Sequence, residues 1–208
     1  MNTTRTYFIS DTHFGHSRII EYCDRPYKDT TQMDIDIIHK WNSVVKPNDT
    51  VWHLGDFAFF SKKDHERIYK LIQKLNGNIN LLLGNHDRHI SDNIQFWMDL
   101  GFKKVWDSPF LFMNDYILSH EPVISKNGID LTYHPKLKNI HGHTHNSNAD
   151  FYAMKPEDQK HWNDEHPNFR TIPDITKHSF NASIEVIDYK PIAFETIIDK
   201  MKKCITLL

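Results

Sequence analysis

Short apolar runs alternate with helical patterns over the first half of the chain. The runs 7–9, 50–54 and 79–83 have the length of buried strands. Apolar residues recur at helical spacing over 31–45 and 61–76, and shorter helices are expected over 17–23 and 91–100. Thr31 with Asp34, and Ser61 with Asp64, resemble helix start signals, and Gly77 is a helix stop signal. This alternation of strands and helices favours parallel strand pairing.

The second half is dominated by strand patterns. Runs 110–113 and 116–119 flank Asn114-Asp115, which predicts a hairpin. A strand is expected over 137–141, a last hairpin from 182–187 and 191–194, and a terminal helix over 195–203. A polar excursion with three prolines covers about 146–180. We therefore predict a single α/β domain over 1–208 that mixes parallel and antiparallel pairing.

Composition narrows the class of protein. Hydrophobic residues make up 39% of the 208 positions and charged residues 25%, as in ordinary globular proteins. The net charge of −2 argues against a broad surface that grips nucleic acid, although a local basic patch stays open. The only cysteines, Cys23 and Cys204, lie in no paired motif, which is typical of free thiols in a reducing cytosol. No run approaches the ~20 apolar residues of a membrane helix and no leader is visible, so we expect a cytoplasmic protein without membrane contact.

Histidine is unusually frequent, with 15 residues, and its placement points to a site. Five clusters share one feature, because each follows an apolar strand. They are Asp11-Thr12-His13, Gly55-Asp56, Gly84-Asn85-His86-Asp87, His120 and Gly142-His143-Thr144-His145. Ligands gather at the carboxyl ends of strands in α/β sheets, so one sheet edge could bring all five together. Glycines 55, 84 and 142 would allow sharp turns beside such a site.

The clusters offer more ligands than one metal ion needs. Asp11 and His13 are two residues apart, as are His143 and His145. In an extended chain the two side chains of each pair would therefore point to the same side. The seven candidate metal ligands are Asp11, His13, Asp56, Asn85, His120, His143 and His145. Seven ligands predict two ions, and Asp56, alone in its cluster, is the candidate bridge. Two dications against two carboxylates leave a positive site that attracts phosphate. Imidazole, carboxylate and amide ligands favour manganese, iron, zinc or their neighbours nickel and cobalt over calcium.

In this order the clusters resemble the calcineurin-like metallophosphoesterase superfamily, whose pattern is D-x-H, GD, GNH(D/E), a lone His and GHxH. The resemblance covers roughly 6–146, and the opening Asp11-Thr12-His13-Phe14-Gly15-His16 is similar to the small bacterial and phage phosphoesterases. It implies two packed mixed β-sheets flanked by helices, in a four-layer αββα sandwich. It also implies two divalent metal ions, with manganese first among them.

The resemblance assigns roles to the candidate residues. One metal would be held by Asp11, His13, Asp56 and His145, and the other by Asp56, Asn85, His120 and His143. A metal-bridging hydroxide would attack phosphorus in line, while His86 donates a proton to the leaving group. The expected substrate is a small phosphoester, above all a phosphodiester or small nucleotide.

The chain departs from the pattern in two places. Many family members have a second acid, GDxxD, that supports the catalytic histidine, and Phe59 stands there in this chain. Asp87 is then the candidate for orienting His86. Phe60 occupies the position of an arginine in the protein phosphatase branch, which disfavours a phosphoprotein substrate.

Other interpretations remain open. Each cluster alone would more often be an ordinary turn or loop, but five such coincidences at strand ends would have to occur together. A catalytically silent protein-binding scaffold would lack a ligand or the acid, and none is lacking here. A DNA nuclease would need a basic groove. Among the remaining residues, His53 and His141 are expected in the core. His16 and Arg18 are expected at a surface helix start, with contact to the substrate phosphate as the alternative. His161, Trp162 and His166 line a lid or pack the excursion.

Overall fold

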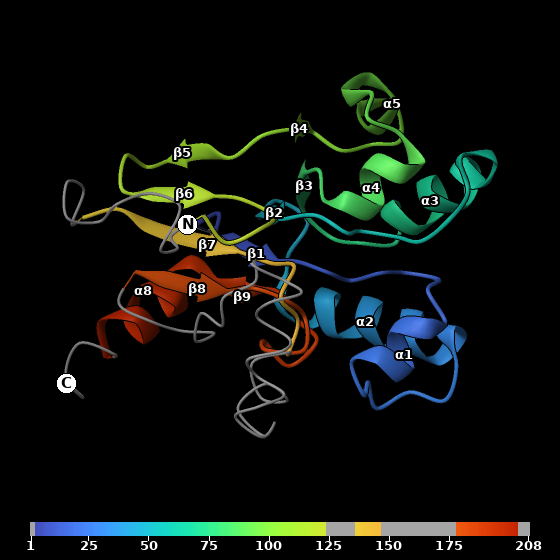
Figure 1. Ribbon diagram of the computed structural model, residues 1–208, viewed down its shortest axis with the longest axis horizontal. Coiled ribbons are helices and arrows are strands. Elements are labelled where there is room, and N and C mark those ends of the chain that lie inside the picture. Colours follow the sequence, from blue (N-terminus) through green and yellow to red (C-terminus); the bar gives the residue numbers. More distant parts are fainter. Residues whose placement is uncertain (1–2, 124–135, 147–177, 204–208) are drawn as a thin grey trace, which may run out of the picture.

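The computed structural model describes residues 3–123, 136–146 and 178–203 and contains two mixed sheets flanked by helices, which confirms the expected fold class (Figure 1). The first sheet has the strand order β4-β3-β2-β1-β9 and the second has the order β5-β6-β7-β8. The first sheet consists of β1 (Thr6–Ile9), β2 (Thr50–His53), β3 (Asn78–Leu82), β4 (Lys104–Trp106) and β9 (Ile192–Ala193). The second consists of β5 (Phe110–Phe112), β6 (Tyr116–Leu118), β7 (Lys138–His141) and β8 (Ser179–Asn181).

The strand register explains where the site can form. Strands β1, β2 and β3 pair in parallel, with Ile9 opposite His53 and His53 opposite Leu81. In the second sheet β6 and β7 are also parallel, with Leu118 opposite Ile140. Because parallel strands end at the same edge, the residues that follow these strands leave each sheet side by side.

The helices connect and cover the sheets. They are α1 (Arg18–Tyr22), α2 (Thr30–Val44), α3 (His65–Ile72), α4 (Asn85–Ile90), α5 (Ile94–Asp99) and α8 (Phe194–Lys203), with a 3₁₀ turn η1 (Lys62–Asp64) before α3. Helix α8 lies against β1 and β8, at the other end of the view from α1 to α5 (Figure 1). Within the described ranges, no helix is long and apolar enough to cross a membrane.

Aromatic side chains hold the two sheets together. The ring of Phe8 on β1 meets Phe112 on β5 edge to face, with centroids 5.7 Å apart. Trp52 on β2 packs against Phe110 on β5 at 5.1 Å. Both pairs join the first sheet to the second, so the sheets share one core, and burying such rings is a large part of core stability.

Several local predictions are corrected by the structure. Asp29 caps α2 by accepting a hydrogen bond from the Gln32 N–H at 2.8 Å, whereas the expected signal at Thr31 lies inside the helix. Helix α3 is shorter than the predicted 61–76 at both ends, and Ser61 donates to the Asp64 carboxylate at 2.7 Å in place of capping the helix. Strand β4 and helix α4 were not predicted.

The predicted last hairpin is wrong. Strands β8 and β9 belong to different sheets, and the chain between them forms tight turns. Ile184 and Ile187 imitate a strand pattern, yet both are buried by a turn in which the Tyr189 N–H donates to the Ile184 carbonyl at 2.9 Å. By contrast, the predicted hairpin around Asn114-Asp115 is confirmed as antiparallel β5 and β6. Of the predicted excursion, residues 147–177 lie outside the described residues, and Ser179 and Phe180 belong to β8.

Candidate metal centre

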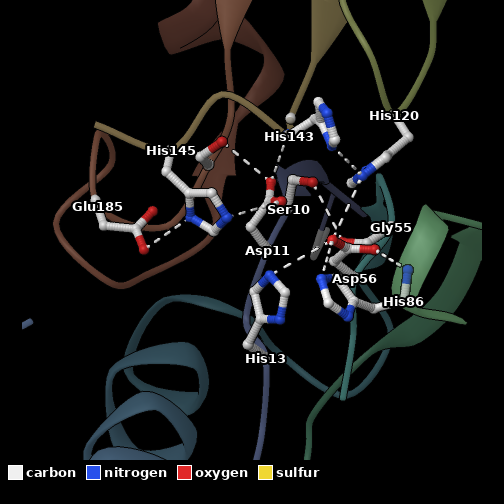
Figure 2. Close-up of polar contacts among 12 residues, drawn as sticks. Ser10, Asp11, His13, Gly55, Asp56, His86, His120, His143, His145 and Glu185 are labelled. Carbon is white, nitrogen blue, oxygen red and sulfur yellow. Dashed lines mark hydrogen bonds and ion pairs between the residues drawn. The ribbon is translucent and has the colours of Figure 1, made fainter. Parts of the chain in front are cut away.

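All seven predicted metal ligands lie in one site, six of them labelled in Figure 2 and the seventh, Asn85, in contact with His120. Asp56 lies at its centre, with Oδ2 3.5 Å from His13 Nε2 and 3.5 Å from His120 Nε2. His145 Nε2 lies 3.7 Å from Asp11 Oδ1. His143 Nδ1 and Asn85 Oδ1 lie 3.0 and 3.1 Å from His120 Nε2, respectively.

These side chains form two neighbouring groups that could each hold a metal ion. Ligand atoms of Asp11, His13 and His145 all lie within 4.8 Å of one another, and so do those of Asp56, His120 and His143. Asp56 also reaches His13 of the first group, as a bridging carboxylate must.

Unpartnered buried atoms support a cation in this place. Asp11 Oδ1 and His13 Nε2 are buried and have no hydrogen-bond partner among the described residues. A buried carboxylate oxygen without a partner is costly, and a dication at that point would remove the cost. The donor set and these atoms therefore fit a pair of divalent ions.

Left-handed backbone, in place of the predicted extended pairs, aims the ligands. The angle φ is positive at five of them: Asp11 (59°), His13 (49°), Asp56 (55°), His143 (70°) and His145 (46°). Such φ values are uncommon for residues other than glycine and cluster at functional sites. Each pair two residues apart does reach one site, but the extended-chain reason for it was wrong.

Two glycines allow chain segments to approach closely. A Cβ atom at Gly142 would lie 1.9 Å from Ser10 Oγ and 2.4 Å from Asp11 Oδ2. Gly55 has a φ of +104°, and a Cβ there would lie 2.6 Å from His120 Nδ1. The sharp turns expected beside the site are therefore also points where no side chain fits.

The two carboxylates are held ionised by the surrounding histidines. Burial alone would raise the pKa of Asp11, but His145 and His120 hold that pKa below its usual value. Burial likewise opposes ionisation of Asp56, whereas hydrogen bonding and charge from His120 lower its pKa to about 2. Without metal, the site therefore keeps two negative charges in a buried place.

The histidines divide according to their partners. Burial lowers the pKa of His13 well below its usual value, despite the nearby Asp56. Burial also acts against protonation of His120, yet Asp56 raises its pKa to about 9. His120 Nδ1 lies 2.8 Å from the Leu54 carbonyl, which fixes the ring so that Nε2 faces Asp56.

Asp87 contacts backbone rather than the imidazole of His86. Its buried carboxylate accepts hydrogen bonds from the N–H groups of Asp56 (2.7 Å), Phe57 (3.0 Å) and Gly84 (2.9 Å). Burial, and then the charge of Asp56, raise its pKa to about 7. Asp87 thereby ties the loop of Asp56 to the start of α4, which gives it a positioning role different from the expected one.

His86 lies at the edge of the site. Its side chain is 29% exposed, and Nε2 lies 4.0 Å from Asp56 Oδ2, so the ring faces both solvent and the ligands. The ring is held edge to face by His13 at 4.9 Å and by Phe59 at 5.5 Å. Phe59, which stands where many relatives have an acid, thus packs against the imidazole. A proton donor at this position could reach a leaving group.

Sequence reasoning missed a buried ion pair behind the site. Arg25 donates to Glu185 through Nε at 2.8 Å and Nη2 at 2.6 Å. The same guanidinium donates to the carbonyls of Asp11 and Thr12 at 2.7 and 2.9 Å. His145 Nδ1 donates to Glu185 Oε1 at 3.1 Å, which turns Nε2 toward Asp11 (Figure 2). No local pattern marks Arg25 or Glu185, because 160 residues separate them.

Three further histidines, His16, His53 and His141, are buried. His53 and His141 are buried as expected, with His53 Nε2 3.0 Å from Thr12 Oγ1. His16 is also buried and stacks on Phe59 at 4.1 Å, so the surface position expected for it is wrong. Residues His161, Trp162 and His166 lie outside the described residues.

The fold and the paired His/Asp clusters define a metallophosphoesterase-like protein. The chain belongs to the calcineurin-like phosphoesterase family, whose sequence profile matches residues 4–193. Membership in this family indicates a hydrolase, and family members typically bind divalent metal ions.

Two of the similar proteins match nearly the whole chain. The chain is 31% identical to an uncharacterized protein of Methanocaldococcus jannaschii over 98% of its own length and 94% of that protein. It is 38% identical over 84 residues to the gene 66 protein of Mycobacterium phage L5, covering 40% of each chain. Among solved structures, a protein of unknown function from Aquifex aeolicus is similar with a TM-score of 0.61 and 28% identity, over 96% of this chain and 100% of that one.

Proposed function

We propose that this protein hydrolyses phosphate esters, above all phosphodiesters or small nucleotides, with the help of two divalent metal ions. Manganese is the metal that we expect first. One observation carries the proposal. Asp56 lies between two groups of ligands, within 3.5 Å of His13 on one side and of His120 on the other. A carboxylate shared between two clusters can hold two ions close together, as two-metal phosphoester hydrolysis needs.

Each residue then has a chemical task. When bound, the ions would polarise the phosphate and activate water for attack on phosphorus. Asp11, His13, Asp56 and His145 would hold one ion, and Asp56, Asn85, His120 and His143 the other. His86, whose side chain is 29% exposed, would donate a proton to the leaving oxygen. Asp87 keeps the loop of Asp56 in place through its three backbone hydrogen bonds.

Metal removal tests the proposal. Protein freed of metal by a chelator should not hydrolyse bis(p-nitrophenyl) phosphate, and added Mn²⁺ should restore turnover with two ions bound per chain. Asp56→Asn should lose both turnover and one or both ions. Asp188→Asn is the matched control, because Asp188 pairs only with exposed Lys190 at 2.7 Å in the described contacts.

Two outcomes would contradict the proposal. Unchanged turnover after complete metal removal would exclude metal-dependent hydrolysis. Absence of turnover across diesters, nucleotides and monoesters, with both ions bound, would favour the protein-binding scaffold instead. Salt-sensitive binding and cleavage of DNA would point to the nuclease.

A further inference from the structure

A pocket of about 340 Å³ opens directly beside the metal centre. Asn85 and His120, both candidate ligands of one ion, line it. Much of the remaining wall is apolar and is formed by Leu82, Leu83, Pro109, Pro122 and Val123. The pocket is therefore continuous with the place where a phosphate would bind, and it offers an apolar surface to whatever is attached to that phosphate.

Helix α4 separates this pocket from His86. Asn85 and Arg88 are three residues apart, share one face of α4 and line the pocket. His86 and His89 share another face, with ring centroids 6.1 Å apart. On that side His86 meets Phe59 at 5.5 Å. The pocket and the proposed proton donor thus lie on different sides of the first turn of α4.

This separation divides a substrate into two parts. The leaving oxygen has to lie beside His86 to receive its proton, so the leaving group occupies the side of His86. A group in the pocket is then a second substituent on phosphorus. A phosphomonoester has no such substituent, whereas a phosphodiester does.

We propose that the pocket binds the retained ester substituent of a phosphodiester, and that this substituent carries one aromatic or otherwise apolar ring system. The inference rests on the proposed function and names the substrate class of the same site. Hydrolysis adds water across the bond between phosphorus and the leaving oxygen. The ring therefore departs from the pocket as a phosphate monoester.

The chemistry of the wall selects the ring. Leu82 and Leu83 are buried at the base, while Ser108 and Pro109 are exposed at the rim. The charged guanidinium of Arg88 donates to the Asp107 carbonyl. Exposed Glu121 and Asp107 also line the pocket, so its apolar surface comes from the leucines, prolines and Val123. The volume lies near the lower end of ligand sites, about 300–1,000 Å³, and so suits a single ring system better than a peptide.

Three substrates with one leaving group test the pocket. They are p-nitrophenyl phosphate, methyl p-nitrophenyl phosphate and phenyl p-nitrophenyl phosphate, and they differ only in the retained substituent. With Mn²⁺ present, kcat/KM should be about 10-fold to 100-fold higher for the phenyl than for the methyl diester, the gain expected from burying one ring. Because p-nitrophenolate leaves without protonation, proton donation by His86 contributes little to the rate, and equally so for all three substrates.

A variant that fills the pocket provides the second arm. Ser108→Trp adds a large ring at the exposed rim, where the hydroxyl of Ser108 donates to the Asp107 carboxylate at 3.0 Å. It should bring the phenyl-to-methyl ratio of kcat/KM within about threefold. Ser43→Trp, at an exposed position of α2, is the matched control and should keep the parent ratio.

The outcomes separate the two proposals. A ratio that survives Ser108→Trp, or a variant that slows all three esters equally, would overturn the pocket assignment, as would a parent that prefers the monoester. If the metal-loaded parent hydrolysed none of the three, the proposed function itself would be wrong.

Discussion

Replacing Glu185 by Gln removes one negative charge from behind the metal centre while keeping the shape of the side chain. The carboxylate of Glu185 accepts from His145 Nδ1 at 3.1 Å and from Arg25 at 2.6 and 2.8 Å. The side chains of Arg25 and Glu185 are 0% and 3% exposed, so solvent screens this pair little. We therefore expect two separable effects, one on folding and one on metal binding.

The expected magnitudes follow from these contacts. Removing one partner of a buried ion pair lowers the free energy of unfolding by about 3–5 kcal/mol. Gln keeps an oxygen that Arg25 can use, so we expect a loss near about 3 kcal/mol. A carboxylate that orients a metal-bound histidine typically contributes about 10–100-fold in metal affinity. Only the ion held by His145 should be affected, because His120 is oriented separately by the Leu54 carbonyl.

Two measurements distinguish the effects. Urea unfolding of metal-free protein measures the free energy of unfolding, and a Mn²⁺ titration of folded protein measures the affinity of each site. In Glu185→Gln one ion should bind as in the parent and the other about 10–100-fold more weakly. Asp188→Asn, in the same loop, should change neither quantity. A folded variant that binds both ions with parental affinity would refute the positioning role of Glu185.

Three further perturbations test other parts of the site. His86→Ala should lower turnover of a diester with a poor leaving group by about 10²–10⁴-fold, and turnover of a p-nitrophenyl ester much less. His89→Ala, at an exposed position, is the control. Equal losses on both esters would exclude the role of His86 as acid. Gly142→Ala should lower the free energy of unfolding by about 1–3 kcal/mol and weaken metal binding, because the new Cβ would lie 1.9 Å from Ser10 Oγ. A variant with the melting temperature and metal affinity of the parent would contradict this close approach. Burial raises the pKa of Asp34 from 3.8 to about 6 in the folded protein, so its ionisation costs stability as the pH rises through this range. Asp34→Asn keeps the acceptor for the Gly15 N–H. After allowance for partial exposure, it should raise the free energy of unfolding by about 1–2 kcal/mol at pH 7 and leave it unchanged near about pH 3.5. Urea unfolding at both pH values measures this, and a gain of equal size at both would contradict the assignment.

The sequence located the ligands because each follows a short buried strand. Asp11 follows β1, His120 follows β6 and Gly142 follows β7, and parallel pairing brings such positions to one edge. The apolar runs and the order of the motifs were sufficient for this much. The two-sheet fold itself was expected from the family resemblance and is confirmed.

The residues behind the ligands could not be found in this way. Arg25 lies in a short connection and Glu185 in a stretch whose isoleucines imitate a strand, so neither stands in a local pattern. Their pairing depends on tertiary contacts across the whole fold. The left-handed backbone at Asp11 and His13 could not be predicted either, because residues other than glycine rarely adopt a positive φ and carry no sequence signal for it.

The ion pair between Arg25 and Glu185 has a consequence for biosynthesis. A ribosome releases the segment with Asp11 and His13 early, but the acidic group that fixes His145 emerges 160 residues after Arg25. Until then the loop of Asp11 and His13 lacks the ion pair that holds Arg25 against its carbonyl groups. The proposed metal ions should therefore bind late in synthesis, after the segment around Ser183 has paired with Ser10 at the end of β1.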